Sequence, residues 1–150
     1  MTRDEQRRQV IEACIAHQQH IADVAKEEMD SAQQQSNDYG ANVDRYDSYR
    51  TKMMRARDMY AQQLSNANAG LRALGELLAL PPADKADHGA IVVTNRGRYF
   101  LSIGLGKFMV GADTYYAISA QTPVYIALRG RQVGDTVVIG SAPQTITSIF

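Results

Sequence analysis

Apolar residues recur at steps of three and four over about thirty positions of the chain, from Tyr49 to Leu78. Because an α-helix makes one turn every 3.6 residues, this spacing places them along one side of a single long helix. The positions are Tyr49, Met53, Ala56, Tyr60, Leu64, Ala67, Leu71, Leu74 and Leu78. Pro81 and Pro82 cannot continue a helix, so we expect this one to end near Leu80.

A first helix of similar length is predicted from about Arg3 to about Ser36, roughly 50 Å at 1.5 Å per residue. Its expected apolar line is Val10, Cys14, His17, Ile21 and Val24, widened by Ile11, Ile15, Ala25 and Met29. The break between the helices lies near 37–44, where Gly40 can cap the first helix and either Asn42 or Asp44 can cap the second. Two long helices around a short break predict an antiparallel hairpin.

The pattern changes after the second helix. Residues 81–88 are rich in proline and charge and are predicted to be a linker. From residue 89 to 150, short β-branched and aromatic runs between glycine turns predict about five strands. One short helix is expected from Pro123 to about Arg129, with Thr122 as its N-cap. The predicted fold class is α+β, with a helical hairpin over 1–80 and a small β-rich domain over 89–150.

Composition limits the function classes. The 16 basic and 16 acidic residues cancel, so no overall field draws the chain onto nucleic acid. The single cysteine allows no internal disulfide and is typical of a reducing compartment. The sequence has no apolar run long enough to span a membrane and no signal-peptide pattern, so we expect a cytoplasmic protein that does not bind membranes.

Charge gathers around the predicted hairpin tip. Three acids, Asp38, Asp44 and Asp47, surround the break, and five cations follow closely: Arg45, Arg50, Lys52, Arg55 and Arg57. The acids are candidate ligands for a hard cation, or they simply favour the positive end of the second helix. The cations are candidate contacts to a phosphate backbone, or they form a solvated helix face.

Several motifs resemble one bacterial family. Gly40 to Tyr46 places acids and an aromatic residue after a glycine, and Gln63-Leu64-Ser65-Asn66-Ala67 lies late in the second helix. Thr122-Pro123-Val124 precedes the short helix, and Gly134-Asp135 opens a strand. In this order and spacing the chain resembles the bacterial Gre transcript-cleavage factors over nearly its whole length.

The resemblance implies a fold, a partner and a mechanism. The C-terminal domain would be FKBP-like and would bind RNA polymerase through Thr122, Pro123 and Val124. The hairpin would enter the secondary channel, where Asp44, assisted by Asp47 and Asp38, would help to hold the Mg²⁺ of the polymerase. The cations from Arg45 to Arg57 would contact nascent RNA or the channel wall. Such a protein would need no cofactor of its own and would assist the nuclease activity of the polymerase rather than being an enzyme itself. A monomer is the favoured expectation.

One position departs from the family pattern. The family carries an acid directly after the tip glycine, where this chain has Ala41, and Asp44 matches the second family acid. Two readings therefore stay open: a factor that stimulates cleavage of backtracked RNA, and a cleavage-inactive regulator that occupies the same channel. A peptidyl-prolyl isomerase and a structural coiled-coil protein are the further alternatives.

Overall fold

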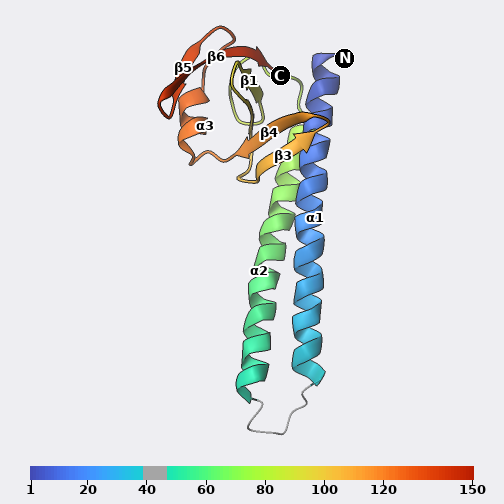
Figure 1. Cartoon of the computed structure of the whole chain (residues 1–150). Coiled ribbons are helices and arrows are strands. Elements are labelled where there is room, and N and C mark those ends of the chain that lie inside the picture. Colours follow the sequence, from blue (N-terminus) through green and yellow to red (C-terminus); the bar gives the residue numbers. More distant parts are fainter. Residues whose placement is uncertain (39–46) are drawn as a thin grey trace. The chain divides into compact units, whose positions relative to one another are not determined.

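The computed structural model describes residues 1–38 and 47–150, and for Asp47 the backbone alone. Helices α1 (Arg3–Asp38) and α2 (Asp47–Leu78) come first, as Figure 1 shows. The strands β1 (Ile91–Thr94), β2 (Arg98–Leu101), β3 (Gly106–Val110) and β4 (Asp113–Ile118) precede helix α3 (Pro123–Leu128), and β5 (Thr136–Ile139) and β6 (Ala142–Ile149) follow it. The predicted α+β class is confirmed. The described residues form six strands, where the sequence predicted about five.

The chain divides into two compact units. The hairpin unit is Gln18–Leu71, and the β unit combines Met1–His17 with Arg72–Phe150. Both long helices therefore begin or end inside the β unit. The predicted division into 1–80, 81–88 and 89–150 stays a prediction.

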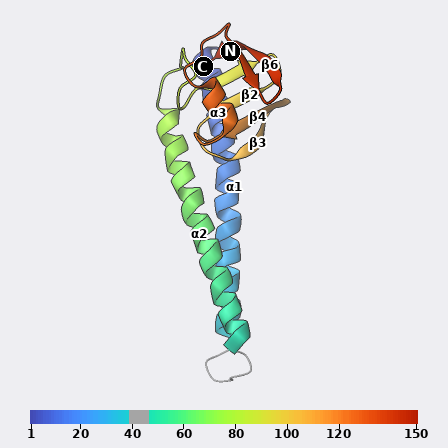
Figure 2. The ribbon, with the colours of Figure 1, turned by 90° about the vertical axis from the view of Figure 1, so that its left-hand side faces the viewer.

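In the hairpin unit the two helices run antiparallel and side by side, as both Figure 1 and Figure 2 show. Contacts between residues far apart in the sequence fix this direction. The side-chain amide of Gln18 donates to the backbone carbonyl of Ala67 at 3.2 Å, and the guanidinium of Arg57 donates to the side-chain oxygen of Gln33 at 2.7 Å. The apolar line predicted for α2 is confirmed, since every one of its nine positions is buried or half-buried.

The central apolar line predicted for α1 is right only at its start, whereas the four widening positions, Ile11, Ile15, Ala25 and Met29, are all buried or half-buried. Val10 and Cys14 are buried, but His17 is exposed, and Ile21 and Val24 are 39% and 42% exposed. The buried side of α1 in the hairpin unit carries the predicted Ala25 and, in addition, small or polar side chains that were not predicted: Gln18, Ala22, Ala32 and Ser36. The predicted steps average 3.5 residues, so they drift around a helix that repeats every 3.6 residues.

The β unit is built on one mixed sheet with the strand order β3-β4-β2-β1-β6-β5. Neighbouring strands are antiparallel except β2 and β4, which are parallel and pair Tyr99 with Tyr116. Strands β3 and β5 are the edges. The predicted hairpin of β3 and β4 is confirmed, with Phe108 opposite Tyr115 across the pair.

The sheet buries both faces against different helices. Because side chains alternate along a strand, Ile91 and Val92 of β1 enter different cores. One face packs on the first turns of α1 and the last turns of α2, in the cluster of Val10, Ile11, Cys14, Leu74, Leu77, Ile91, Phe100, Phe108, Tyr115, Ala117 and Phe150. The other face packs on α3, with Val92, Leu101, Tyr125, Leu128, Val137, Ile146 and Ile149.

The ends of the shorter elements follow local chemistry. Helix α2 ends at Leu78, two residues before the predicted end, and the amides of Ala79 and Leu80 bond three residues back as the chain approaches Pro81. Thr122 is the N-cap of α3, as predicted: its hydroxyl oxygen accepts from the Tyr125 amide at 3.3 Å.

Residues 81–88 are closely joined to the β unit. Ala86 is buried, and its amide donates to the Arg131 carbonyl at 2.9 Å. Lys85 forms a β-bridge with Gln132. Gly89 then turns the chain with a φ of 92°, which residues other than glycine rarely adopt. A Cβ at this position would also lie 2.8 Å from the Leu77 side chain, so both the backbone conformation and the close contact require glycine.

Candidate functional site

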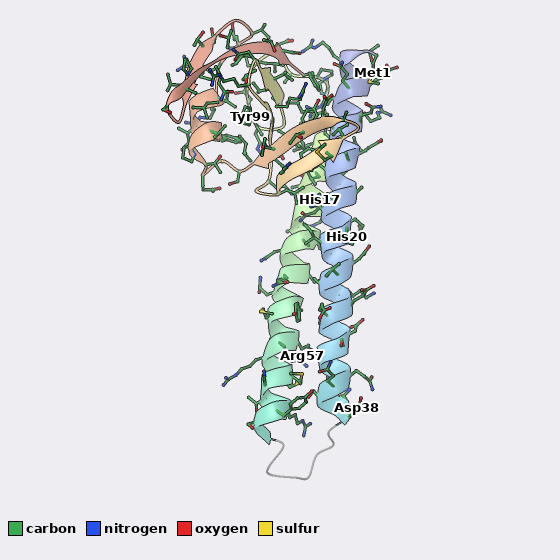
Figure 3. The ribbon with its side chains drawn as sticks, in the orientation of Figure 1. Met1, His17, His20, Asp38, Arg57 and Tyr99 are labelled. Atoms are coloured by element: carbon green, nitrogen blue, oxygen red, sulfur yellow. The ribbon has the colours of Figure 1, made fainter. Side chains whose placement is uncertain are left out.

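The described residues next to the predicted tip are solvated. Asp38 is the last residue of α1 and is exposed, and Figure 3 labels it at that helix end. Its carboxylate accepts a hydrogen bond of 2.8 Å from the side-chain amide of Gln34, one turn earlier in the helix. Asp47 begins α2. Asp44 and Arg45 lie outside the described residues, as do Gly40 and Ala41.

The cations of the first turns of α2 divide into two kinds. Arg50, Lys52 and Arg55 are exposed, and within the described part of the chain none of them forms an ion pair. Arg57 is half-buried, and its guanidinium donates to Asp58 at 2.7 Å and to Gln33 of α1 at 2.7 Å. Figure 3 labels Arg57 on α2. Arg57 is therefore engaged in holding the two helices together, whereas the other three can take an anionic ligand.

Polar contacts cross between the helices in this half of the hairpin unit. Besides the Arg57–Gln33 bond, the Tyr49 hydroxyl donates to the Gln35 side chain at 3.2 Å. A small cavity of about 170 Å³ lies between the helices, lined by Glu28, Ser31, Ala32, Gln35, Met53, Ala56 and Tyr60. Directional bonds thus fix the register of the helices where apolar burial is thin.

The second candidate element is the beginning of α3. Thr122 donates its hydroxyl to the Ser119 carbonyl at 2.8 Å while it caps the helix, so its side chain is fixed in place. Pro123 is exposed at the first helical position, and Val124 is half-buried against the α3 core. The three residues predicted to bind a partner therefore form one rigid helix start, with Pro123 at the surface.

The β unit has a groove between α1 and the sheet, which the sequence did not indicate. It has a volume of about 750 Å³ and is lined by Val10, Val93, Val110, Tyr115 and Phe150 among others. Arg98 and Asp113, which both line the groove, form an ion pair at 3.5 Å, and the guanidinium of Arg98 lies 5.9 Å from the centre of the Tyr115 ring. Burial raises the pKa of Tyr115, while the charge of Arg98 acts in the opposite direction. No helix periodicity or motif could have shown this groove, because it depends on how the sheet meets α1.

Arg7 is a buried cation that the sequence also did not indicate. Only 3% of the residue is exposed, and its guanidinium donates to the backbone carbonyls of Leu77, Leu80, Gly89 and Phe150. Burial lowers its pKa, and the charge of Asp4 acts in the opposite direction. One turn earlier, Arg3 donates to the carbonyls of Ala83 and Ile149. The two arginines join α1 to the end of α2, to the connection that follows and to the last strand.

Metal-binding chemistry is limited in the part of the chain that the structure describes. No group of three or more His, Cys, Asp or Glu side chains there could hold a metal ion. His17 and His20, labelled in Figure 3, are both exposed on α1. Among the described helices, none is long and apolar enough to cross a membrane.

We compared the chain with models of protein families, with characterised proteins and with solved structures, and none of them matched.

Proposed function

We propose that this chain is a Gre-like elongation factor that binds bacterial RNA polymerase and inserts its helical hairpin into the secondary channel. The proposal rests on the motifs that resemble the Gre factors and on one structural observation. Two helices of 36 and 32 residues form an antiparallel pair whose connected ends carry exposed charge, Asp38 on one side and Arg50, Lys52 and Arg55 on the other. A narrow charged rod suits entry into a channel that leads to nucleic acid.

The acids near the tip would act on the metal ion of the polymerase. Asp44, with Asp38 and Asp47 beside it in the sequence, supplies carboxylate oxygens near a Mg²⁺ ion that belongs to the polymerase. Metal ions in phosphoryl transfer stabilise the attacking and leaving oxygens, so an added carboxylate can position such an ion or its water. The factor needs no cofactor of its own and is not itself an enzyme.

The cations serve the approach to RNA. Arg50, Lys52 and Arg55, together with Arg45, face the RNA or the channel wall, and they replace counterions along the phosphate backbone. Arg57 contributes indirectly, because its bond to Gln33 keeps the two helices in register. Thr122, Pro123 and Val124 provide the rigid surface that binds the polymerase. We place this activity in the cytoplasm and assign it to a monomer.

A second candidate function has specific support in the sequence. Ala41 stands where the Gre pattern has an acid, so a cleavage-inactive factor would bind the polymerase in the same way and regulate it by occupying the channel. Both functions share the partner and the mode of binding. They differ only in whether Asp44 suffices to assist the chemistry.

A transcript-cleavage assay on a stalled elongation complex with Mg²⁺ tests the first function. The wild-type protein should release short 3′ RNA fragments weakly, and Asp44→Ala should abolish the release. Ala41→Asp supplies the acid that the family pattern has directly after the glycine and should increase the rate at least tenfold, in the range in which a single charged contact changes a catalytic step. Equal rates for wild type, Asp44→Ala and a buffer control would reject cleavage and leave the regulator.

A further inference from the structure

Four strands of the β unit bring one row of side chains into register on the sheet face that also carries α3. Val92 of β1 pairs with Tyr99 of β2, Tyr99 pairs with Tyr116 of β4, and Tyr116 pairs with Lys107 of edge strand β3. The two tyrosine rings lie with centroids 6.2 Å apart and planes tilted by 31°. The parallel pairing of β2 and β4 makes these tyrosines direct neighbours although 17 positions separate them in the sequence.

The row is covered at one end and open at the other. Val92 is fully buried in the core under α3, and Tyr99 is half-buried at the margin of that core. Tyr116 is 41% exposed, and Lys107 is exposed. Met109, next to Lys107 on the same face, is 51% exposed. Helix α3 therefore covers Val92 and the margin of Tyr99 but leaves Tyr116 and Lys107 open to solvent.

The tyrosine that borders α3 is held in place. The Tyr99 hydroxyl donates to the side-chain oxygen Oε1 of Gln144 at 3.3 Å, and the same oxygen accepts from the Thr94 hydroxyl at 2.6 Å. The hydroxyl also lies against the turn at Gly97, where a Cβ would come within 2.7 Å of it. Because the Tyr99 ring is already fixed, little conformational entropy is lost when a flat ligand stacks on the tyrosine pair.

The charge around the row is positive. Lys107 lies at its open end, and Arg96 is exposed in the turn beside the Tyr99 hydroxyl. Neither forms an ion pair with any residue that the structure describes. The positions of this face on β3 and β4 carry no carboxylate, because Asp113 belongs to the opposite side of the sheet, where it pairs with Arg98.

We propose that the row Tyr99–Tyr116–Lys107 is a platform on which a single-stranded polynucleotide stacks its bases. Tyrosine rings on the open face of a sheet suit the flat faces of unpaired bases, and cations beside them suit the phosphates. A proline-rich peptide also packs on aromatic side chains, but it would use neither cation. Because every base has such a face, RNA and DNA are bound by the same chemistry. The inference does not depend on the proposed binding of RNA polymerase.

Fluorescence anisotropy of the full chain with labelled ten-nucleotide oligo-U and oligo-dT strands tests the platform. Tyr116→Ala should weaken binding roughly five- to one-hundredfold, the range for the loss of one stacking side chain. Tyr116→Phe keeps the ring and should bind within about twofold of wild type. Lys107→Gln should reduce the slope of log K against log salt by about 0.7, the loss of one phosphate contact to a single strand.

Two comparisons separate the platform from other cations. Arg129→Gln removes an exposed charge of the β unit outside the row and should leave affinity nearly unchanged. The triple change of Arg50, Lys52 and Arg55 to glutamine tests the hairpin cations, and the effect of Tyr116→Ala should persist in that background. The platform is rejected if neither strand binds, if Tyr116→Phe and Tyr116→Ala bind alike, or if the triple change alone abolishes binding. Because the polymerase is absent, none of these results bears on the proposed elongation function.

Discussion

Two adjacent arginines on α1, Arg7 and Arg8, meet opposite environments. Arg7 is buried and bonded to four backbone carbonyls, whereas Arg8 is exposed and forms a loose pair with Asp4 at 3.7 Å. Leu77 and Leu80 belong to the last turn of α2 and its continuation, where carbonyls have no partner within the helix. Arg7 thus caps α2 from another helix while it holds Gly89 and Phe150.

Replacement of Arg7 by methionine should destabilise the protein strongly. The change keeps an unbranched, largely apolar side chain but removes the guanidinium, so buried carbonyls are left without a donor, and each such group costs about 1–3 kcal/mol. We expect the free energy of unfolding to fall by roughly 2–5 kcal/mol. Arg8→Met is the matched control and should change it by less than about 0.5 kcal/mol. Urea denaturation followed by circular dichroism measures both, and equal effects would contradict the capping role of Arg7.

The single cysteine gives a second prediction at the residue scale. Burial raises the pKa of Cys14 to about 12, so its thiol stays protonated and unreactive at neutral pH. The folded-state pKa lies above the unfolded value of about 8.5, so the stability linked to this group is complete below pH 8.5 and declines as the pH rises towards 12. A disulfide reagent at pH 8 should label the protein only when urea unfolds it. Rapid labelling of the native protein would show that Cys14 is accessible.

At the scale of elements, the hairpin unit joins its helices through small side chains. Ala22, Ala25 and Ala32 of α1 and Ala67 of α2 are buried, while Ile21 and Val24 face solvent. Alanine lets helix backbones approach closely but buries little apolar area. Because each Å² of buried apolar surface stabilises the fold by about 25 cal/mol, this seam contributes little free energy. The interhelical bonds of Gln18, Gln33 and Gln35 therefore matter more here than in a leucine-rich pair.

Enlarging this seam should be costly. Ala25→Leu adds three carbons where the helices are in close contact and should destabilise the hairpin by about 1–3 kcal/mol. Val24→Leu, one position away on the exposed side, should change stability by less than about 0.5 kcal/mol. Urea melts of the helical signal compare the two variants. If Val24→Leu were the more damaging change, the buried side of α1 would be the one that carries Ile21 and Val24.

The success of sequence reasoning at this scale differed between the two helices. On α2 large apolar residues mark the buried side, so periodicity located it correctly. On α1 the large residues Ile21 and Val24 are exposed and alanines are buried, so residue size misled the prediction. The Thr122 cap was predictable because it depends on neighbouring residues alone. The groove, the Arg7 contacts and the Tyr99–Tyr116 pair depend on strand order, which local patterns do not contain.

At the scale of the whole molecule, the candidate site is predictable in part. Arg50, Lys52 and Arg55 are exposed as a contact role requires, and Thr122 to Val124 form a fixed helix start. Arg57 differs from its neighbours because its partner Gln33 lies 24 residues away. Asp44 and Arg45 lie outside the described residues, so their roles stay predictions. Both proposed functions, with and without cleavage, require that the chain bind RNA polymerase.

Binding to bacterial core RNA polymerase, measured by biolayer interferometry with the full chain, therefore tests both proposed functions most directly. Wild type should bind, and Pro123→Glu should weaken binding at least tenfold, because it places a charge on the exposed start of α3 and still allows the helix to begin. Val138→Glu, an exposed change on β5, should bind like wild type. No binding by the wild-type protein, or equal binding by all three, would contradict the proposed docking of this chain on the polymerase.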